Sequence, residues 1–246
     1  MSKRFNIAVV SDIHYAGAAE KARGIQEIRV VENAAIRLLI QTYRRFIWLK
    51  DPMAYNHLLE VFNQRAIDAD LAVANGDYSC DSLFVGVSDP AARESALECL
   101  GKLRARFGTR LEAVFGDHEL GKMSLAGGRG GLRLASWDEA NHALGLRPLW
   151  TRGIGRYRLV GVTSSLVALP VYEPETLAEE RDEWWRLRIE HLRAIAGVFD
   201  ELSQDERVIL FCHDPTALPF LLREESVRSR IHQIERTIIG LSLIHI

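Results

Sequence analysis

Residues 6–14 read NIAVVSDIH, a short apolar run that ends in a carboxylate and an imidazole two positions apart. An apolar run bounded by polar residues predicts a strand buried on both faces, as in sheets covered by helices. Side chains alternate along an extended chain, so Asp12 and His14 project together if the extended path continues past Val10. Ligands bind at the carboxyl ends of strands in open α/β sheets, which makes this pair a candidate for a functional site.

Strand-like and helix-like patterns alternate along the 246 residues, which predicts a single α/β domain. Short apolar runs predict further strands at residues 71–75, 111–115, 157–162, 208–211 and 237–239. Apolar residues at helical spacing, or an N-cap followed by proline, predict helices at residues 30–49, 58–69, 90–107, 136–144 and 179–202. The aromatic segment 43–49 would either form a cap over a ligand site or pack into the core.

The composition, 48% hydrophobic and 26% charged, is that of an ordinary soluble globular protein. A net charge of -2 gives no support for a general binder of nucleic acids or membrane surfaces, although it leaves room for a local basic patch. No segment approaches the roughly 18 apolar residues of a membrane span. The three cysteines, Cys80, Cys99 and Cys212, lack the spacing of a disulfide framework or a zinc ribbon. We therefore expect a cytoplasmic protein in a reducing compartment.

Candidate metal or acid–base residues follow four of the predicted strands: Asp12 and His14, Asp77, Asp117 and His118, and His213. Taken singly, such residues are more often turn or cap residues, or ordinary histidines, than ligands. Gathered at one sheet edge, they indicate a site. Imidazole and carboxylate without thiolate suit manganese, iron or zinc, and clustered carboxylates need cations to offset their charge. Two metals about 3.5–4 Å apart, bridged by one carboxylate, can clamp a phosphoryl group during in-line displacement.

In order along the chain, these residues resemble the motifs DxH, GDxxD, GNH(D/E) and a lone His of the calcineurin-like metallophosphoesterases. The resemblance spans nearly the whole chain. It implies an α/β fold of the calcineurin-like type, a four-layer αββα sandwich with two mixed β-sheets flanked by helices. It also implies that Asp12 and His14 bind a first metal, that Asp77 bridges two metals, and that Asp117 and His213 bind the second.

The resemblance further implies the chemistry. His118 would stabilise the phosphoryl oxygens or protonate the leaving group, with Glu119 holding its ring. Two divalent metal ions (Mn, Fe or Zn) would share a hydroxide that attacks the phosphorus of a phosphoester substrate. The alternative is a protein of the same fold that acts as a non-catalytic binding scaffold, metal-free or weakly metallated. A chain with no site at all would require four unrelated coincidences at strand ends.

Two departures from the motifs concern aspartates. Asp117 stands where the family has asparagine, which adds a negative charge, favours tight cation binding and would slow the entry of a doubly charged substrate. Asp81 follows Asp77 one residue later than the GDxxD spacing requires, so no role is assigned to it. A glycine-rich segment, residues 127–131, is expected to be a surface loop more readily than a carrier of Arg129 to a phosphate.

The closing GHxH motif of the family is absent, although residues 237–240 lead up to the point where it would begin. The last residues, LSLIHI at 241–246, match the translation of a transposase sequencing-adaptor end, CTG TCT CTT ATA CAC ATC. We therefore expect a metallophosphoesterase domain at residues 1–240, a non-native tail at 241–246, and a fold whose last strands are missing. Each metal would then lack one histidine, which would impair turnover. The alternative is a natural apolar C-terminal strand.

Overall fold

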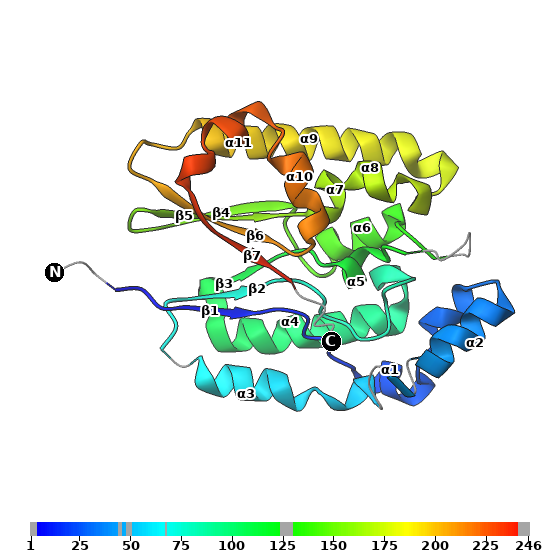
Figure 1. Ribbon diagram of the computed structural model, residues 1–246. Helices are drawn as coiled ribbons and strands as arrows, with labels where there is room; N and C mark the ends of the chain where they lie inside the picture. The colour runs from blue at the N-terminus through cyan, green and yellow to red at the C-terminus, as the bar shows by residue number, and fades with distance from the viewer. Residues whose placement is uncertain (1–3, 44–45, 48–50, 67, 124–129, 241–246) are drawn as a thin grey trace.

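Two β-sheets stack face to face in the computed structural model, which describes residues 4–43, 46–47, 51–66, 68–123 and 130–240. The three-stranded sheet has the order β1 (Ile7–Val10), β2 (Leu71–Ala74), β3 (Leu111–Ala113). The four-stranded sheet has the order β4 (Leu149–Ile154), β5 (Tyr157–Val162), β6 (Arg207–Cys212), β7 (Ile234–Ile239). Helices cover the outer face of each sheet, which gives the four layers of the predicted sandwich (Figure 1).

Helices form both outer layers. In the view of Figure 1, α3 (His57–Arg65) and α4 (Pro90–Phe107) lie below the three-stranded sheet, and α9 (Arg181–Asp200) lies above the four-stranded one. The remaining α-helices are short: α1 (Ala18–Arg23), α2 (Ala34–Tyr43), α5 (Asp117–Leu120), α6 (Leu134–His142), α7 (Ser164–Val167), α8 (Leu169–Tyr172), α10 (Leu218–Leu221) and α11 (Glu225–Ser229). Among the described residues, no helix combines the length and apolarity that crossing a membrane requires.

The two sheets differ in strand direction. All described pairs of the three-stranded sheet are parallel, so the expectation of a mixed sheet is met only by the four-stranded one. There β4 pairs antiparallel with β5, while β5, β6 and β7 run parallel. Strand β4 was not predicted, because Arg152 and Gly153 interrupt its apolar residues. It forms a hairpin in which Ile154 pairs with Tyr157, and Gly155 takes the left-handed conformation (φ 58°) that a tight turn needs.

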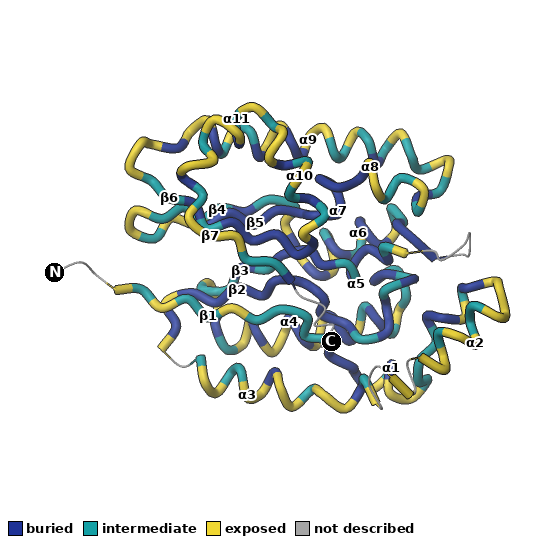
Figure 2. Tube along the Cα trace, viewed as in Figure 1, coloured by how far each residue is buried: buried dark blue, intermediate teal, exposed yellow. Residues whose placement is uncertain are grey.

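Alternating side chains of β2 build two separate parts of the core. Leu71 and Val73 pack between the sheets with Phe211 of β6. Ala72 and Ala74 point to the other side and pack in the cluster that contains the buried residues of α4. The buried strands run through the centre of the molecule in Figure 2, and the exposed residues lie mainly on the outer helices. A strand buried on both faces explains the continuous apolar run at residues 71–74.

Helix α4 was predicted at its observed bounds, and the side chain of Asp89 caps it by accepting a hydrogen bond from the Ala92 N–H at 2.9 Å. The helix predicted at residues 30–49 is different. A 3₁₀ turn, η1 (Glu27–Val30), precedes α2, which begins at Ala34 and contains no buried residue. In Figure 1, α2 projects beyond the sandwich at the right.

Three sequence predictions fall wholly or partly outside the described residues. Of the aromatic segment 43–49, the described residues Tyr43, Phe46 and Ile47 are exposed, so they do not pack into the core. Residues 127–129 of the glycine-rich segment, with Arg129, lie outside the described residues. So does the tail at 241–246.

Candidate metal centre

The carboxyl ends of the parallel strands bring the predicted ligands together. The segments that follow β1 and β2 are joined by backbone hydrogen bonds, in which the N–H groups of His14 and Tyr15 donate to the carbonyls of Asp77 and Tyr78 at 2.9 and 3.0 Å. His213 follows β6 in the other sheet, and its Nδ1 lies 2.6 Å from the carbonyl oxygen of Asn75. The site therefore lies where the two sheets meet.

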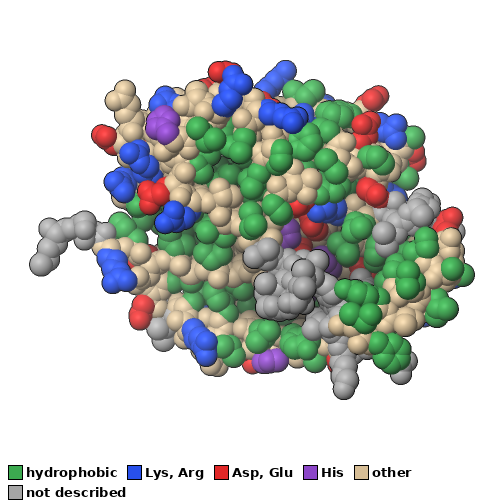
Figure 3. Space-filling model, in the orientation of Figure 1, with side chains coloured by type: hydrophobic (Ala, Val, Ile, Leu, Met, Phe, Trp, Pro, Cys, Tyr) green, Lys and Arg blue, Asp and Glu red, His purple; other side chains and the backbone are tan. Residues whose placement is uncertain are grey.

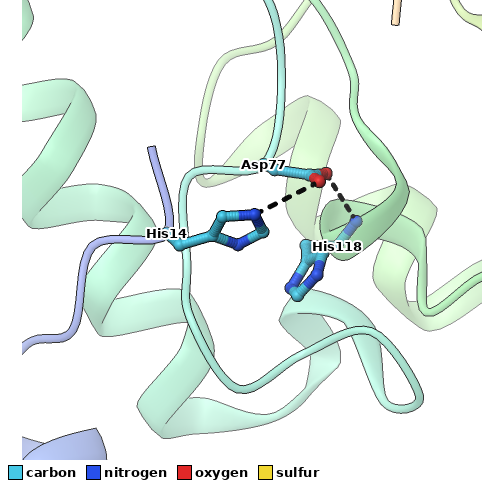
Figure 4. A group of neighbouring side chains, drawn as sticks. All are labelled: His14, Asp77 and His118. Carbon is cyan, nitrogen blue, oxygen red and sulfur yellow. Dashed lines mark hydrogen bonds and ion pairs between the residues drawn. The ribbon is translucent and has the colours of Figure 1, made fainter. Parts of the chain in front are cut away.

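Asp77 lies at the centre of the site. Its carboxylate belongs to two groups of possible ligand atoms, each within 4.8 Å: one with His14 and His118, the other with Asp12 and His213. The Oδ2 atom of Asp77 lies 3.9 Å from Nε2 of His14 and 3.2 Å from Nε2 of His213. Figure 4 shows His14, Asp77 and His118 converging from three segments. A carboxylate shared by two groups is the arrangement expected of a bridging ligand.

The two groups of neighbouring ligand atoms do not coincide with the sets of metal ligands that the resemblance implies. Asp12 and His14, which the resemblance assigns to one metal, fall into different groups, and His118, expected to act on the substrate, joins His14. The ring centroids of His14 and His118 are 4.6 Å apart. The structure thus brings together five of the six predicted residues in these two groups. Asp117 belongs to neither group, although it lines the same cavity.

The backbone at Asp12, His14 and Asp77 is left-handed, with φ of 53°, 46° and 60°. The extended path therefore does not continue past Val10, so the reason first given for Asp12 and His14 projecting together is wrong. Such a conformation costs a non-glycine residue on the order of 1–3 kcal/mol and clusters at functional sites, where the surrounding structure enforces it. Because three predicted ligands have this left-handed backbone, we infer that the fold imposes the geometry of the site.

Gly76 precedes Asp77 and Gly116 precedes Asp117, and neither glycine position has room for a side chain. A Cβ on Gly76, whose φ is 91°, would lie 2.6 Å from Cα of Gly116 and from Nδ1 of His213. A Cβ on Gly116 would lie 2.3 Å from Oδ1 of Asp77. These glycines let the segments after β2 and β3 approach closely enough to share one site.

Glu119 does not hold the ring of His118, contrary to the expectation from the resemblance. Its buried carboxylate accepts hydrogen bonds from three backbone N–H groups, those of Asp77, Tyr78 and Gly116, at 3.0, 2.8 and 2.7 Å. Burial, with a further contribution from Asp77, raises the pKa of Glu119 to about 7, and the three hydrogen bonds oppose that shift. Glu119 therefore fixes the left-handed backbone at Asp77, not the imidazole.

Ser82 contacts the imidazole instead, since its Oγ lies 3.1 Å from Nδ1 of His118 and 2.6 Å from Oγ of Ser79. The backbone N–H of His118 donates to Oδ1 of Asp77 at 2.9 Å. Sequence reasoning missed Ser82, because a serine in a loop carries no signal of its target. These contacts orient both the ring and the main chain of His118.

Asp117 forms an ion pair that the sequence did not predict. Lys122 donates to Oδ2 of Asp117 at 2.7 Å and to Oδ2 of Asp214 at 2.6 Å. Its positive charge offsets the charge that aspartate adds in place of asparagine, so the expected gain in cation affinity is reduced. Burial raises the pKa of Asp117 to about 6, against the opposing effect of Lys122. The sequence feature that could have indicated this ion pair is Lys122, five positions after Asp117.

Asp77 and His213 form a buried charge pair in the absence of metal. Burial disfavours the charge on each, but their attraction outweighs it, which holds the pKa of Asp77 well below its usual value and raises that of His213. A metal ligand must be a neutral imidazole, so a cation that binds His213 has to displace this proton.

Asp81, to which no role was assigned, has a structural one. Its Oδ2 accepts hydrogen bonds from the backbone N–H groups of Gln26 and Glu27 at 2.7 and 3.2 Å. The guanidinium of Arg23 lies 3.4 Å away. Asp81 therefore anchors η1 to the segment that follows Asp77.

The donor set fits divalent cations. Oδ1 of Asp117 is buried and has no hydrogen-bond partner among the described residues, an arrangement that a cation would relieve. Carboxylates and imidazoles surround the centre, and neither group of possible ligand atoms contains a thiolate. These are the ligands of manganese, iron or zinc.

Comparison with known proteins agrees with this chemistry. The sequence profile of the family described as calcineurin-like phosphoesterase matches residues 5–239. The chain belongs to this family. Membership indicates metal-dependent hydrolysis of a phosphoester. Comparison with curated protein sequences gave no match. A similar solved structure is that of a phosphopantetheinyl hydrolase from Mycobacterium tuberculosis, at 13% identity and a TM-score of 0.42, covering 97% of this chain and 83% of that one.

Proposed function

We propose that the protein hydrolyses a phosphoester at a centre of two divalent metal ions, with manganese the first metal to try. The observation that carries the proposal is Asp77, whose carboxylate belongs to both groups of possible ligand atoms. Asp77 would bridge the ions. We keep the division that the resemblance implies, in which Asp12 and His14 would bind one ion and Asp117 and His213 the other, because it leaves His118 to act on the substrate. The ions, when bound, would polarise the phosphoryl oxygens and lower the pKa of a coordinated water.

The protein's own groups supply positioning and proton transfer. His118, oriented by Ser82 and by the hydrogen bond from its N–H to Asp77, would donate a hydrogen bond to a phosphoryl oxygen or a proton to the leaving oxygen. Lys122 would keep Asp117 from repelling an anionic substrate, because it shares the carboxylate charge. Glu119 would hold the segments after β2 and β3 in register.

The test is manganese-dependent hydrolysis of p-nitrophenyl phosphate and bis(p-nitrophenyl) phosphate. We expect Asp77→Asn to lower kcat/KM for the ester that is cleaved by more than about 100-fold, beyond the cost of losing a residue that only supports a ligand. The matched control is Asp205→Asn, which changes an exposed aspartate far along the chain and should act as wild type. Activity retained in Asp77→Asn would overturn the metal assignment. Manganese binding without hydrolysis of either ester would favour the scaffold alternative.

A further inference from the structure

The candidate metal centre opens into a large cavity of about 990 Å³. The predicted ligands line one part of it, and apolar side chains line the rest. We call the following set the apolar wall: Leu39, Ile40, Tyr43, Met53, Tyr55 and Leu58. Figure 3 shows hydrophobic side chains gathered over α2, beside the recess in which histidine and acidic side chains are visible.

Four of the six residues of the apolar wall are exposed, although a core would bury such side chains, whereas Met53 is buried and Ile40 is partly buried. Leu39 is 69% exposed and Leu58 is 56% exposed. They belong to α2 and α3, and Met53 lies on the 3₁₀ turn η3 (Pro52–Ala54) between these helices. Exposed apolar surface that is continuous with a cleft marks a ligand groove more often than chance packing. The periodicity that predicted a helix in this segment therefore reports a ligand-facing surface instead of a core-facing one.

The charged residues that line the cavity limit the kind of substrate that it can bind. Among the described residues that line the cavity there is no lysine or arginine, and the charged ones are aspartates and histidines. The described part of the lining therefore offers no such cation to a second phosphate or a carboxylate on the organic part of a substrate. Recognition of nucleoside di- and triphosphates relies on lysine and arginine, so this part of the lining favours an uncharged organic part.

We propose that the substrate is a phosphoester of an extended, uncharged apolar alcohol, whose chain lies along the apolar wall while its phosphate lies at the metal centre. This inference rests on the proposed function, because that function places the phosphate. The cavity connects the two surfaces, and its volume is that of a site for a whole small molecule. The wall supplies affinity in proportion to the apolar area that it covers.

The test is binding of non-hydrolysable methyl-, butyl- and octylphosphonate to the manganese-loaded protein, measured by calorimetry. Each methylene that the wall covers should tighten binding about fourfold. We expect octylphosphonate to bind more than about 100-fold tighter than methylphosphonate, which allows for incomplete coverage of the chain. Leu39→Ala should weaken octylphosphonate about fivefold and leave methylphosphonate unchanged.

The matched control is Leu38→Ala. Leu38 neighbours Leu39 on α2 and is 64% exposed, but it does not line the cavity. It should leave all three affinities unchanged. Equal effects of both substitutions, accompanied by binding to phosphatidylcholine vesicles, would show a general surface for lipid and overturn the proposal. So would equal affinities for methyl- and octylphosphonate, or no binding of octylphosphonate.

The two proposals fail in different ways. Hydrolysis of an aryl phosphate ester without any dependence of phosphonate affinity on chain length defeats the substrate class and leaves the proposed function standing. Dependence on chain length that requires Leu39, in a protein that hydrolyses no ester, defeats the proposed function and leaves the apolar wall as the binding surface.

Discussion

The metal centre and the apolar wall line one cavity but are built in opposite ways. Asp77 and His213 at the centre are each 4% exposed. The side chain of His213 contacts the Asn75 carbonyl across the two sheets, and the side chain of Asp77 accepts a hydrogen bond from the His118 N–H within one sheet. Leu39 of the wall is 69% exposed, on a helix with no buried residue. The difference indicates a division of tasks, in which the sandwich fixes the reacting groups and a peripheral helix selects the organic part of the substrate.

Disrupting the frame of the metal centre gives the largest expected effect on this comparison. Glu119→Gln replaces an acceptor of three backbone hydrogen bonds by a group that cannot accept them all. We expect manganese affinity to fall by about 10- to 100-fold, the range for residues that support ligands, while the dependence of phosphonate affinity on chain length persists. Calorimetry with manganese and with the phosphonates measures both. The control is Glu201→Gln, at an exposed glutamate. If Glu119→Gln also abolished the dependence of phosphonate affinity on chain length, the metal centre and the apolar wall would not have separate tasks.

The stability of the fold that carries both regions depends on pH through His191, which lies neither in the metal centre nor in the apolar wall. His191 is buried, its Nε2 accepts a hydrogen bond from the Thr163 N–H at 3.1 Å, and burial lowers its pKa to about 3 from 6.5. Below pH 6.5 the unfolded chain takes up a proton at this position that the folded protein excludes, so the fold loses stability as pH falls from 6.5 toward 3. At pH 5 this loss is about 2 kcal/mol in the free energy of unfolding.

Urea unfolding of the metal-free protein at pH 7.5 and pH 5 measures the effect. His191→Gln should be less stable than wild type at pH 7.5 but should lack this part of the loss at pH 5. His232→Gln, at an exposed histidine, should keep the wild-type dependence. An identical pH dependence in His191→Gln would show that other groups govern it.

The smallest expected effect separates His118 from the metal ligands. Ser82→Ala removes the hydrogen bond to the ring of His118, worth about 1 kcal/mol, so kcat should fall about fivefold with manganese affinity unchanged. Ser88→Ala, whose hydroxyl donates to the carbonyl of Val85, should act as wild type. A loss of manganese affinity in Ser82→Ala would instead place His118 among the metal ligands.

The residues that the structure gathers at the candidate metal centre could be picked out from the sequence, because strand ends and motif residues are local features. Asp12, Asp77 and His213 each follow a short apolar run, and parallel strands bring such ends to one edge. The other predicted strands were found for the same reason. The prediction that residues 6–14 form a strand buried on both faces was wrong, because β1 lies at the edge of the described three-stranded sheet and Val9 is 38% exposed. Strand β4 was missed because a strand that carries Arg152 and Gly153 has no continuous apolar run.

The rest depended on contacts between distant segments. The acceptor role of Glu119 exists only once the segments after β2 and β3 meet, so a motif could not distinguish it from a partner of His118. Lys122 pairs with Asp214, 92 positions away. Residues 34–43 show helical periodicity, yet periodicity does not tell whether the apolar face covers a core or lines a cavity.

The most direct test of the central claim is calorimetric titration of the metal-free protein with manganese. Since Asp77 belongs to both groups of possible ligand atoms, its loss should affect both ions at once. The account predicts about two ions bound per chain in wild type and in Asp205→Asn, and neither bound tightly in Asp77→Asn. Binding of manganese by Asp77→Asn with the stoichiometry and affinity of wild type would contradict it.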